Sequence, residues 1–552
     1  MSDRARKNTT AVDGSTDADV PGGDVTGAGV GGAEAGSAGI DAAVVQATAA
    51  NAAEPASASA PAPATAWAAS PEVLRWLGAV ATLLLTGAAW TALLVTDPPP
   101  AVAVTALAAG VSGVGLLVLA WSLLGRTARA PGGLPAVAWL RGTLALWAAP
   151  LVVAPPLFSG DVHSYLAQGE IAARGMDPYE LGPAQALGAD SEIVSRVSDY
   201  WQGTPSPYGP LTTAIQQAIA TAAPGDPVVG VLLHRAFALL GVLLVVWSVQ
   251  RLAVLAGVSR RTALWLGALN PLVLWHFVAG VHNDALMVGL VLSGVAVALI
   301  ALTGEVDRWQ LAGGIALIGT GAAVKLPAII ALAVVGTALA RRFGGGSGRF
   351  VLAGAAMVVA SVVVFAALSL ATGVGFGWLF TLGTSGGVNS WMAPTNWFGF
   401  LTGGIGALFG ASITQTMIGV GKLIGYAVIA GCFARVLHRQ LRGRVEPIAA
   451  LGLMMAAFVA FGPVIQPWYL LWTVPALAAC LPVGRVHRRI ALLVAVLSLV
   501  IPPLAGNFAG RVGELVGGYA GGALVVAAVF FALRRVGERA AVAQTGWARP
   551  RG

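Results

Sequence analysis

The sequence predicts an all-α polytopic membrane protein with about 14 transmembrane helices, joined by extracytoplasmic loops that carry short interfacial helices. Hydrophobic residues make up 57% of the 552 positions and charged residues only 10%, whereas a soluble domain carries roughly 25% charged residues. Mean hydropathy is +0.79. Because so few charges cannot cover a large surface in contact with water, lipid must cover much of this chain.

The N-terminal segment differs in composition from everything that follows it. It is rich in Ala, Gly, Ser, Thr, Asp and Pro and has few large apolar residues before Trp67. Such a segment cannot bury enough apolar surface to offset the entropy lost on ordering. We therefore expect a disordered cytoplasmic tail at 1–70, a multi-spanning domain at 71–536 and a cytoplasmic C-terminal tail at 537–552.

Long apolar runs follow one another from Val73 onward. A helical span needs about 20 predominantly apolar residues. Two further apolar stretches, 209–223 and 397–411, are brief, and we interpret them as interfacial or re-entrant helices. The expected spans are 73–95, 101–124, 137–156, 228–250, 262–280, 284–303, 309–324, 327–340, 350–371, 413–434, 446–464, 466–483, 489–507 and 515–533.

The arginines predict the orientation, because cytoplasmic loops carry an excess of Lys and Arg. With the N-terminus inside, the predicted outside loops hold only Arg174, Arg196, Lys325 and Arg511. The inside loops hold Arg126, Arg129, Arg251, Arg260, Arg261, Arg341, Arg342, the arginines of 435–444 and 485–489, Arg534 and Arg535. We therefore expect a multi-pass plasma-membrane protein with both termini inside. Basic clusters spaced this way give no support to nucleic-acid binding.

The two cysteines are uninformative about chemistry. Cys432 and Cys480 both lie within apolar runs, and they form neither a disulfide framework nor a CxxC metal pair.

The longest predicted outside loop, 157–208, carries a patterned set of polar residues. If 161–173 is helical, Asp161, Tyr165 and Gln168 share one face, at spacings of four and seven, while Glu170 points away. Tyr208 follows in the Pro-rich end of the same loop. Because Asp161 comes between a span and this helix, we interpret it as functional.

Other outer segments add polar and aromatic groups to the same predicted side. His282, Asn283 and Asp284 precede one span, Lys325 lies at another boundary, and Gln466, Trp468 and Tyr469 open a third. Simpler roles are available: Asn283 and Asp284 suit a helix N-terminus, Lys325 can snorkel, and aromatic residues often form an interfacial belt. Lys422 is an intramembrane cation, a functional candidate with no partner visible in the sequence.

This set of residues suits transfer of a sugar from a lipid. A carboxylate can act as general base toward a hydroxyl, and a nearby cation can hold a phosphate leaving group. No Walker loop, HExxH or GxSxG occurs in a credible context, which disfavours nucleotide, zinc and serine hydrolases. An outside active site has no supply of nucleotide sugars, so an activated lipid is the sensible donor.

At these residues the sequence resembles a known family. The matching motifs are Asp161 to Glu170, Gly175 to Tyr179, Pro205 to Leu211, His282 to Asp284, Lys325 to Pro327 and Gln466 to Leu470. In this order they resemble the actinobacterial polyprenol-phosphate-mannose-dependent α-1,6-mannosyltransferases, which have the GT-C fold and build the mannan backbone of lipomannan and lipoarabinomannan. The resemblance covers about 70–535.

The resemblance implies roles for these residues. Asp161 would be the catalytic base, although Val162 follows it where many GT-C enzymes have a second acid, so Glu170 or Asp284 could share its role. His282 and Lys325 are candidates for binding the donor phosphate. The candidates for sugar and acceptor contacts are Tyr165, Gln168, Tyr208, Asn283, Gln466, Trp468 and Tyr469.

The implied reaction is a single inverting displacement at the outer membrane face. The partners would be a polyprenyl-phosphate-linked mannose donor, a glycolipid or mannan acceptor and the lipid bilayer. No cofactor is expected, and no ligand cluster in the sequence demands a metal.

Two other functions stay open at this point. A lipid-linked sugar flippase or other transporter would have similar halves and ionisable groups near the midplane, and only Lys422 lies at that depth. A GT-C relative could instead move another sugar, such as arabinose, or glycosylate protein. A scaffold role fits least, because it would not need polar groups on one face.

Overall fold

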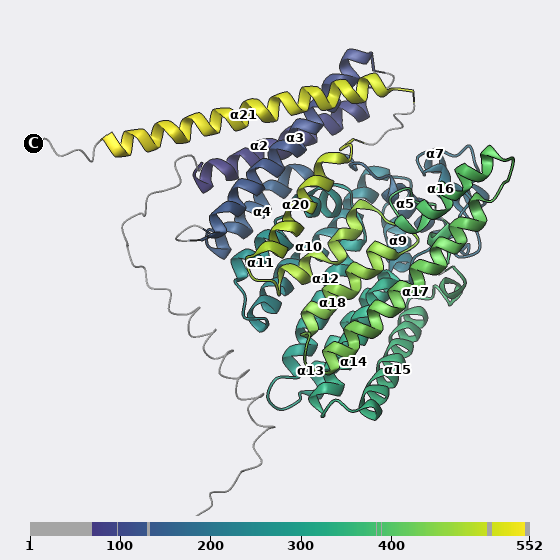
Figure 1. Cartoon of the computed structure of the whole chain (residues 1–552). Coiled ribbons are helices and arrows are strands. Elements are labelled where there is room, and N and C mark those ends of the chain that lie inside the picture. Colours follow the sequence, from purple (N-terminus) through teal and green to yellow (C-terminus); the bar gives the residue numbers. More distant parts are fainter. Residues whose placement is uncertain are drawn as a thin grey trace, which may run out of the picture.

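The computed structural model describes residues 69–95, 98–129, 133–381, 383–387, 389–504 and 510–546, and in these ranges the chain is helical, with no β-strand (Figure 1). The all-α prediction is confirmed for this part of the chain. The predicted N-terminal tail lies outside the described residues except for Ala69 and Ser70. At the other end, α21 continues from Val512 to Gly546, across the predicted boundary at 536.

Seven of the described helices are long and apolar enough to cross a membrane. They are α2 (Pro71–Leu94), α3 (Pro100–Arg126), α10 (Pro227–Leu255), α12 (Asp284–Ala301), α15 (Ser347–Thr372), α17 (Thr414–Leu441) and α21 (Val512–Gly546). Two shorter apolar helices, α4 (Val137–Val152) and α18 (Pro447–Phe461), match predicted spans as well. The remaining spans correspond to helices that are shorter or broken, including α13 (Arg308–Val324), η3 (Leu326–Ile329), α14 (Ile330–Arg342) and α20 (Arg485–Val500).

Two of the predicted spans are not continuous helices, so the prediction was wrong there. The segment 262–280 forms α11 (Arg260–Gly267) and a π-helix, η2 (Val273–Ala279), on either side of Pro271. Proline lacks the N–H that an α-helix requires, and the Asn270 side chain instead accepts a hydrogen bond from the Val273 amide at 3.1 Å. The segment 466–483 forms η6 (Pro467–Trp472) and α19 (Val474–Ala478), each with a proline in its first turn.

The shorter predicted helices are present. The stretch 209–223 forms α9 (Pro210–Ala222), and 397–411 falls mostly within α16 (Pro394–Leu408). The long loop contains α5 (Asp161–Ala173), α6 (Pro183–Leu187), α7 (Glu192–Ser195) and α8 (Asp199–Gln202). The other short elements are η1 (Thr127–Arg129), η4 (Gly377–Phe380) and η5 (Thr384–Gly387).

Small residues bring the central helices close together. A Cβ on Gly241 of α10 would lie 2.2 Å from the backbone of Ala285 in α12, and one on Gly294 of α12 would lie 2.6 Å from the Gly314 carbonyl of α13. Such contacts are typical of helix packing in membranes. Most of α12 is buried as a result, so the N-terminal end of α12 is a rigid support for side chains.

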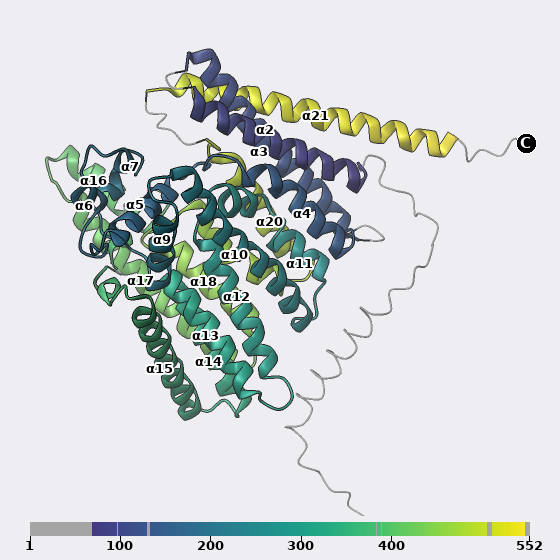
Figure 2. The same cartoon turned by 180° about the vertical axis from the view of Figure 1, so that it is seen from behind.

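A second group of helices lies along one side of the molecule. In both views α2, α3 and α21 lie together there, apart from the bundle around α12 (Figures 1 and 2). A Cβ on Gly518 or Gly522 of α21 would meet the side chains of Leu107 and Val111 in α3, at 2.5 Å each. This group lies away from the polar cluster described below.

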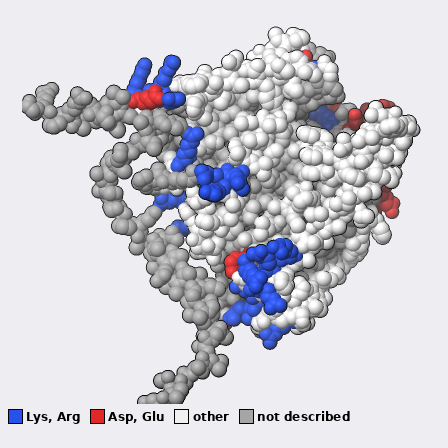
Figure 3. Space-filling model, in the orientation of Figure 1, with Lys and Arg blue, Asp and Glu red and all other residues white. Residues whose placement is uncertain are grey.

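Basic side chains are concentrated in part of the surface. Figure 3 shows Lys and Arg gathered mainly at the lower end and the left side, with acidic residues beside some of them and others to the right. Arg341 lies 3.4 Å from Glu446, and Arg342 donates to the Gly304 carbonyl at 2.6 Å. The loops after α12, α14 and α17 therefore meet at one end, which agrees with the positive-inside pattern of the sequence.

Candidate active site

Asp161 occupies the first turn of α5, where the helix dipole favours a carboxylate. Its backbone amide donates to Ser159 Oγ at 3.1 Å, which fixes the start of the helix. The predicted face of α5 is confirmed: Tyr165 and Gln168 are buried, and the Asp161 side chain is 22% exposed. Of the three residues on this face, Asp161 is therefore the one whose side chain is partly exposed.

His282 lies next to Asp161. Its Nδ1 atom is 3.5 Å from Asp161 Oδ2, and its side chain is fully buried. The His282 imidazole stacks on the Trp468 ring, with 3.8 Å between centroids and 25° between planes. The carboxylate and the imidazole therefore face each other, with an aromatic ring behind the imidazole.

The backbone is strained shortly before Asp161 and again directly before His282. Among the described residues, Phe158 and Val281 are the two non-glycine residues with positive φ, at 62° and 58°. Such angles are costly for bulky residues and most of all for a β-branched one. Phe158 precedes Asp161 by one short turn, and Val281 precedes His282 directly. Strain of this kind gathers at functional sites, where surrounding structure must maintain it.

Asp284 forms a buried ion pair with Lys325. Lys325 Nζ donates to both carboxylate oxygens of Asp284, at 3.0 Å each, and Trp472 Nε1 donates to Oδ1 at 2.7 Å. The Asp284 side chain is fully buried and that of Lys325 is 16% exposed. Lys325 therefore faces Asp284 rather than reaching toward the bilayer surface, and Asp284 is already fully engaged.

Aromatic rings from η6 surround the ion pair. Tyr469 and Trp472 stack with 4.0 Å between ring centroids, and Lys325 Nζ lies 5.0 Å and 5.5 Å from their centroids. A second aromatic contact joins α5 to the end of the long loop, where the Tyr208 and Tyr165 rings pack edge to face with 5.4 Å between their centroids. These are the flat surfaces against which a sugar ring can pack.

Neighbouring charges determine the direction of the pKa shifts of Asp161 and Lys325, which both lie outside the spanning helices. Burial alone would raise the pKa of Asp161, but its interactions with His282 and Lys325 outweigh burial and hold that pKa below its usual range. Burial would lower the pKa of Lys325, and the charge of Asp284 instead raises it well above its ordinary value. Asp161 is therefore a carboxylate and Lys325 a cation at neutral pH.

Several buried polar atoms near Asp161 have no hydrogen-bond partner. Leaving a buried polar group unpaired costs about 1–3 kcal/mol, so a concentration of such groups needs an explanation. The unpartnered atoms are Tyr165 Oη, His276 Nδ1 and Nε2, His282 Nε2, Asn283 Oδ1 and Nδ2, and Trp468 Nε1. A polar ligand or water bound among them would supply the missing partners.

The structure brings together most, but not all, of the residues singled out in the sequence. Gln168 is buried between α5 and α9, where its Oε1 accepts from Ser206 and Gln216 at 3.3 Å and 3.4 Å. Glu170 lies on the opposite face of α5 and pairs with Arg174 at 2.8 Å. Gln466 is half-buried at the start of η6. Asn283 occupies the N-cap of α12, although its side chain makes no capping bond.

Sequence reasoning missed His276. This residue lies in π-helix η2, is fully buried, stacks on Trp275 at 4.5 Å and lies 5.9 Å from the His282 ring. π-helical turns are rare and often occur at functional sites. The available signal was an ionisable residue in the middle of an apolar run.

Arg235 of α10 was missed too. Its guanidinium is buried and donates to the carbonyls of Val152, Ala154 and Val278, at 2.6 Å, 2.7 Å and 3.1 Å. These carbonyls lie at the end of α4 and in η2, the segments that lead to Asp161 and His282. Arg235 therefore joins the two strained segments.

Lys422 has a partner away from this cluster. Its Nζ donates to the Gly386 carbonyl at 2.7 Å and to Asn389 Oδ1 at 3.2 Å. These bonds account for the intramembrane cation without a catalytic role. Within the described residues, no three His, Cys, Asp or Glu side chains gather as metal ligands.

Family comparisons match both halves of the chain. Residues 75–341 match the model described as alpha-(1→6)-mannopyranosyltransferase, N-terminal domain, and residues 395–531 match the MptB C-terminal domain. The first of these ranges contains Asp161, His282, Asp284 and Lys325, and the second contains Trp468.

Individual relatives agree with the family models. A probable alpha-(1→6)-mannopyranosyltransferase of Mycolicibacterium smegmatis is 40% identical over 402 residues, which is 69% of this chain and 72% of the relative. An alpha-(1→6)-mannopyranosyltransferase of Mycobacterium tuberculosis is 36% identical over 78% of this chain and 80% of its own length. Alpha-(1→6)-mannopyranosyltransferase B of Corynebacterium glutamicum is 36% identical over 66% of this chain and 64% of its own length.

Proposed function

Because this chain belongs to the alpha-(1→6)-mannopyranosyltransferase family and is therefore a mannosyltransferase, we propose that it transfers mannose from a polyprenyl-phosphate mannose donor to the 6-hydroxyl of a mannan acceptor. The acceptor class is the backbone of lipomannan or lipoarabinomannan. The pairing of Asp161 with buried His282 is the observation that carries the proposal.

The proposed step is a single displacement at the anomeric carbon. The acceptor O6 attacks C1 of the donor mannose, Asp161 accepts the hydroxyl proton, and the C1–O bond to phosphate breaks from the opposite face. The products are the extended mannoside and polyprenyl phosphate. Because the displacement inverts C1, an α-linked product requires a β-linked mannosyl donor.

Asp161 is suited to accept that proton. A general base must be ionised and within reach of its substrate, and the lowered pKa of Asp161 and its 22% exposure meet both needs. Asp284 is bound on both oxygens by Lys325 and Trp472, and Glu170 faces the other side of α5. In this proposal neither of them shares the role of base.

The leaving phosphate needs a positive or hydrogen-bonding partner. Lys325 Nζ carries three N–H groups, of which two donate to Asp284, so the third can donate to a phosphate oxygen. The Nε2 atom of His282 has no partner, and it can donate to another phosphate oxygen when the ring is doubly protonated, because Nδ1 already faces Asp161. Phosphate is a good leaving group, so no general acid is required.

Sugar contacts are assigned to the rings and amides around this pair. Tyr208, Trp468 and Tyr469 offer flat faces, and Tyr165 and Asn283 offer unpartnered polar atoms. Gln466 lies at the start of the same aromatic segment. Gln168 supports α5 from behind through Ser206 and Gln216.

We further propose a GT-C fold of about 14 crossings in the plasma membrane, with this cluster on the extracytoplasmic face. The basic loops gathered at the opposite end support that orientation. A donor carried by a membrane lipid suits a site on that face, where nucleotide sugars are not supplied.

A donor and acceptor assay tests the proposal. Membranes containing the chain are incubated with short α-1,6-mannosides and either radiolabelled polyprenyl-phosphate mannose or GDP-mannose. We expect label to enter a longer mannoside from the lipid donor alone, and an α-1,6-mannosidase to release it. Transfer from GDP-mannose in membranes depleted of polyprenyl phosphate would contradict the donor assignment.

A further inference from the structure

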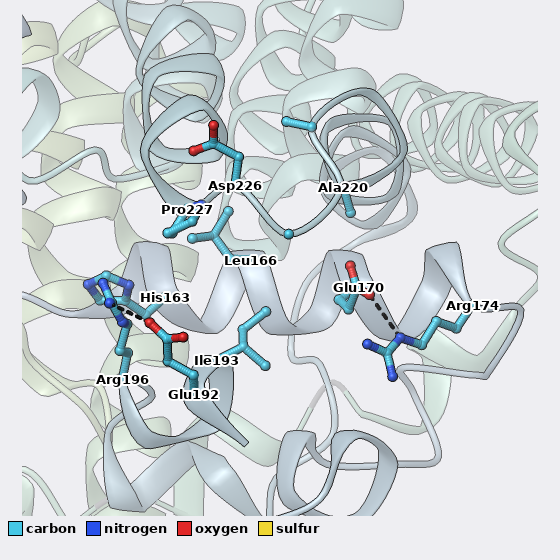
Figure 4. A pocket seen from close by; sticks show the side chains of 12 residues that line it. His163, Leu166, Glu170, Arg174, Glu192, Ile193, Arg196, Ala220, Asp226 and Pro227 are labelled. Carbon is cyan, nitrogen blue, oxygen red and sulfur yellow. Dashed lines mark hydrogen bonds and ion pairs between the residues drawn. The ribbon is translucent and has the colours of Figure 1, made fainter. Parts of the chain in front are cut away.

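A second face of α5, the helix that carries Asp161, lines a cavity with several polar and charged side chains. Side chains at His163, Leu166, Glu170 and Arg174, spaced by three and four, line a cavity of about 210 Å³ on the side of α5 away from Tyr165. Figure 4 shows α5 along one wall of this cavity. The other walls come from α7, the end of α9 and the turn before α10.

Two ion pairs lie at opposite ends of the cavity (Figure 4). Arg174 Nε is 2.8 Å from Glu170 Oε1, and Arg196 Nη2 is 2.8 Å from Glu192 Oε1. Each pair uses one carboxylate oxygen and one guanidinium nitrogen, so each keeps both acceptors and donors for a ligand. The side chains are 22–82% exposed, and exposed pairs of this kind contribute only ~0–1 kcal/mol to stability.

The charge balance disfavours an anionic ligand. Three carboxylates, on Glu170, Glu192 and Asp226, face two guanidinium groups in the lining. Burial, assisted by Arg196, lowers the pKa of His163, so its ring is neutral at pH 7. The floor between the ion pairs is apolar and includes Leu166 and Ile193.

These features match a neutral ring that carries many hydroxyl groups. Hydroxyls donate to carboxylates and accept from guanidinium groups at the same time, while the apolar face of a sugar ring can lie on Leu166 and Ile193. The volume is below the ~300–1,000 Å³ of sites for drug-sized ligands. It therefore suits one ring of a longer chain rather than a whole oligosaccharide.

We propose that this cavity is a distal acceptor subsite, which binds an uncharged hexose of the growing glycan on the far side of α5 from Asp161. The inference rests on the proposed function, because the glycan is its acceptor. A helix with side chains is about 10 Å across, so an acceptor of one or two sugars held at Asp161 is too short to pass around α5, whereas a longer one has the length to do so.

Acceptor length therefore provides the test. The full chain in proteoliposomes is assayed with lipid-linked mannose and α-1,6-mannosides of two to eight residues. Arg196→Ala and Glu192→Gln should each raise KM for the long acceptors about tenfold, the value of a hydrogen bond to a charged group, and leave kcat and the KM of mannobiose unchanged. Arg196→Lys should retain part of the binding, so its KM for the long acceptors should rise less than that of Arg196→Ala.

The matched control is Arg534→Ala, which breaks an ion pair of the same i,i+4 type in α21, between Arg534 and Glu538. It should change no parameter. Equal KM values of wild type and Arg196→Ala for every acceptor length would overturn the inference. A rise in the KM of the lipid donor alone would also overturn it, because the cavity would then bind the lipid. An equal fall in kcat with all acceptors would overturn it as well, because Arg196 would then have a structural role.

A binding measurement separates this inference from the proposed function. Saturation-transfer NMR with α-1,6-mannohexaose is recorded on the Asp161→Asn protein and on Asp161→Asn with Arg196→Ala, both in nanodiscs. We expect contacts to the internal sugars to disappear in the second protein only. If wild type transfers no mannose, the proposed function fails and this comparison still decides the inference: equal spectra would overturn it.

Discussion

Lys325 Nζ lies 3.0 Å from both carboxylate oxygens of Asp284, across 41 residues of sequence and within the same buried cluster. Removing one partner of a buried pair leaves the other charge uncompensated and costs about 3–5 kcal/mol. Asp284→Asn should therefore lower the unfolding midpoint in detergent, measured at a fixed scan rate, by several degrees. The double variant Asp284→Asn with Lys325→Met should recover much of that loss.

The exposed pair of Arg341 and Glu446 supplies the control for this prediction. Surface pairs are worth ~0–1 kcal/mol, so Arg341→Ala should leave the midpoint almost unchanged. A midpoint for Asp284→Asn equal to that of the wild type would show that the pair does not support the fold.

The pH dependence of transfer should report the contact between His282 and Asp161. The pKa of Asp161 is held below its ordinary value by His282 against the effect of burial, so the acid limb of kcat/KM should lie below about pH 4. His282→Phe keeps a ring against Trp468 and removes the imidazole. Burial then dominates, the pKa of Asp161 rises, and the acid limb should move to higher pH.

The profile is measured from about pH 3, so that it includes the wild-type acid limb, up to about pH 8, at a subsaturating donor concentration. His438→Phe, in the last turn of α17, is the control and should keep the wild-type profile. An unchanged acid limb in His282→Phe would mean that His282 does not set the ionisation of the base.

Arg235 should affect turnover without contacting substrate. Its guanidinium joins the end of α4 to η2 through several carbonyls, and a lysine ammonium cannot reach them all. Arg235→Lys should lower kcat about 10–100-fold, since small displacements of catalytic groups have effects of that size, and change the donor KM little. Arg251→Lys in the same helix, where Arg251 lies over exposed Trp247, should be silent. A larger change in KM than in kcat would contradict a positioning role.

Cysteine labelling tests the orientation. In a protein whose Cys432 and Cys480 are replaced by alanine, a cysteine at exposed Ala189 should react with an impermeant thiol reagent on intact cells. One at exposed Arg442, after α17, should react only after the membrane is opened. The reverse pattern would place the Asp161 cluster in the cytoplasm and remove the reason for a lipid donor.

The parts of the fold that follow local rules could be predicted from the sequence. The spacing of Asp161, Tyr165 and Gln168 predicted a shared face if 161–173 is helical, and the structure has α5 from Asp161 to Ala173 with Tyr165 and Gln168 buried. Most apolar runs became helices close to their expected bounds, because apolar length and flanking polar residues determine them.

Features that depend on tertiary packing could not be predicted. Nothing local pairs Lys325 with Asp284, and both residues also suited simpler roles at a helix end or a membrane surface. The π-helix that carries His276 has no distinctive periodicity in a uniformly apolar run. Pro271 and Pro475 lie within the runs 262–280 and 466–483, and because proline lacks an amide N–H they were local signals of interruption that the prediction did not use.

The most direct test of the account is the turnover of Asp161→Asn with polyprenyl-phosphate mannose and a short α-1,6-mannoside. The substitution keeps the shape of the side chain and removes its capacity to accept a proton, so kcat should fall about 10²–10⁴-fold while donor binding stays the same or tightens. Turnover near the wild-type value, in protein that is folded and inserted, would contradict the assignment of Asp161 as the base.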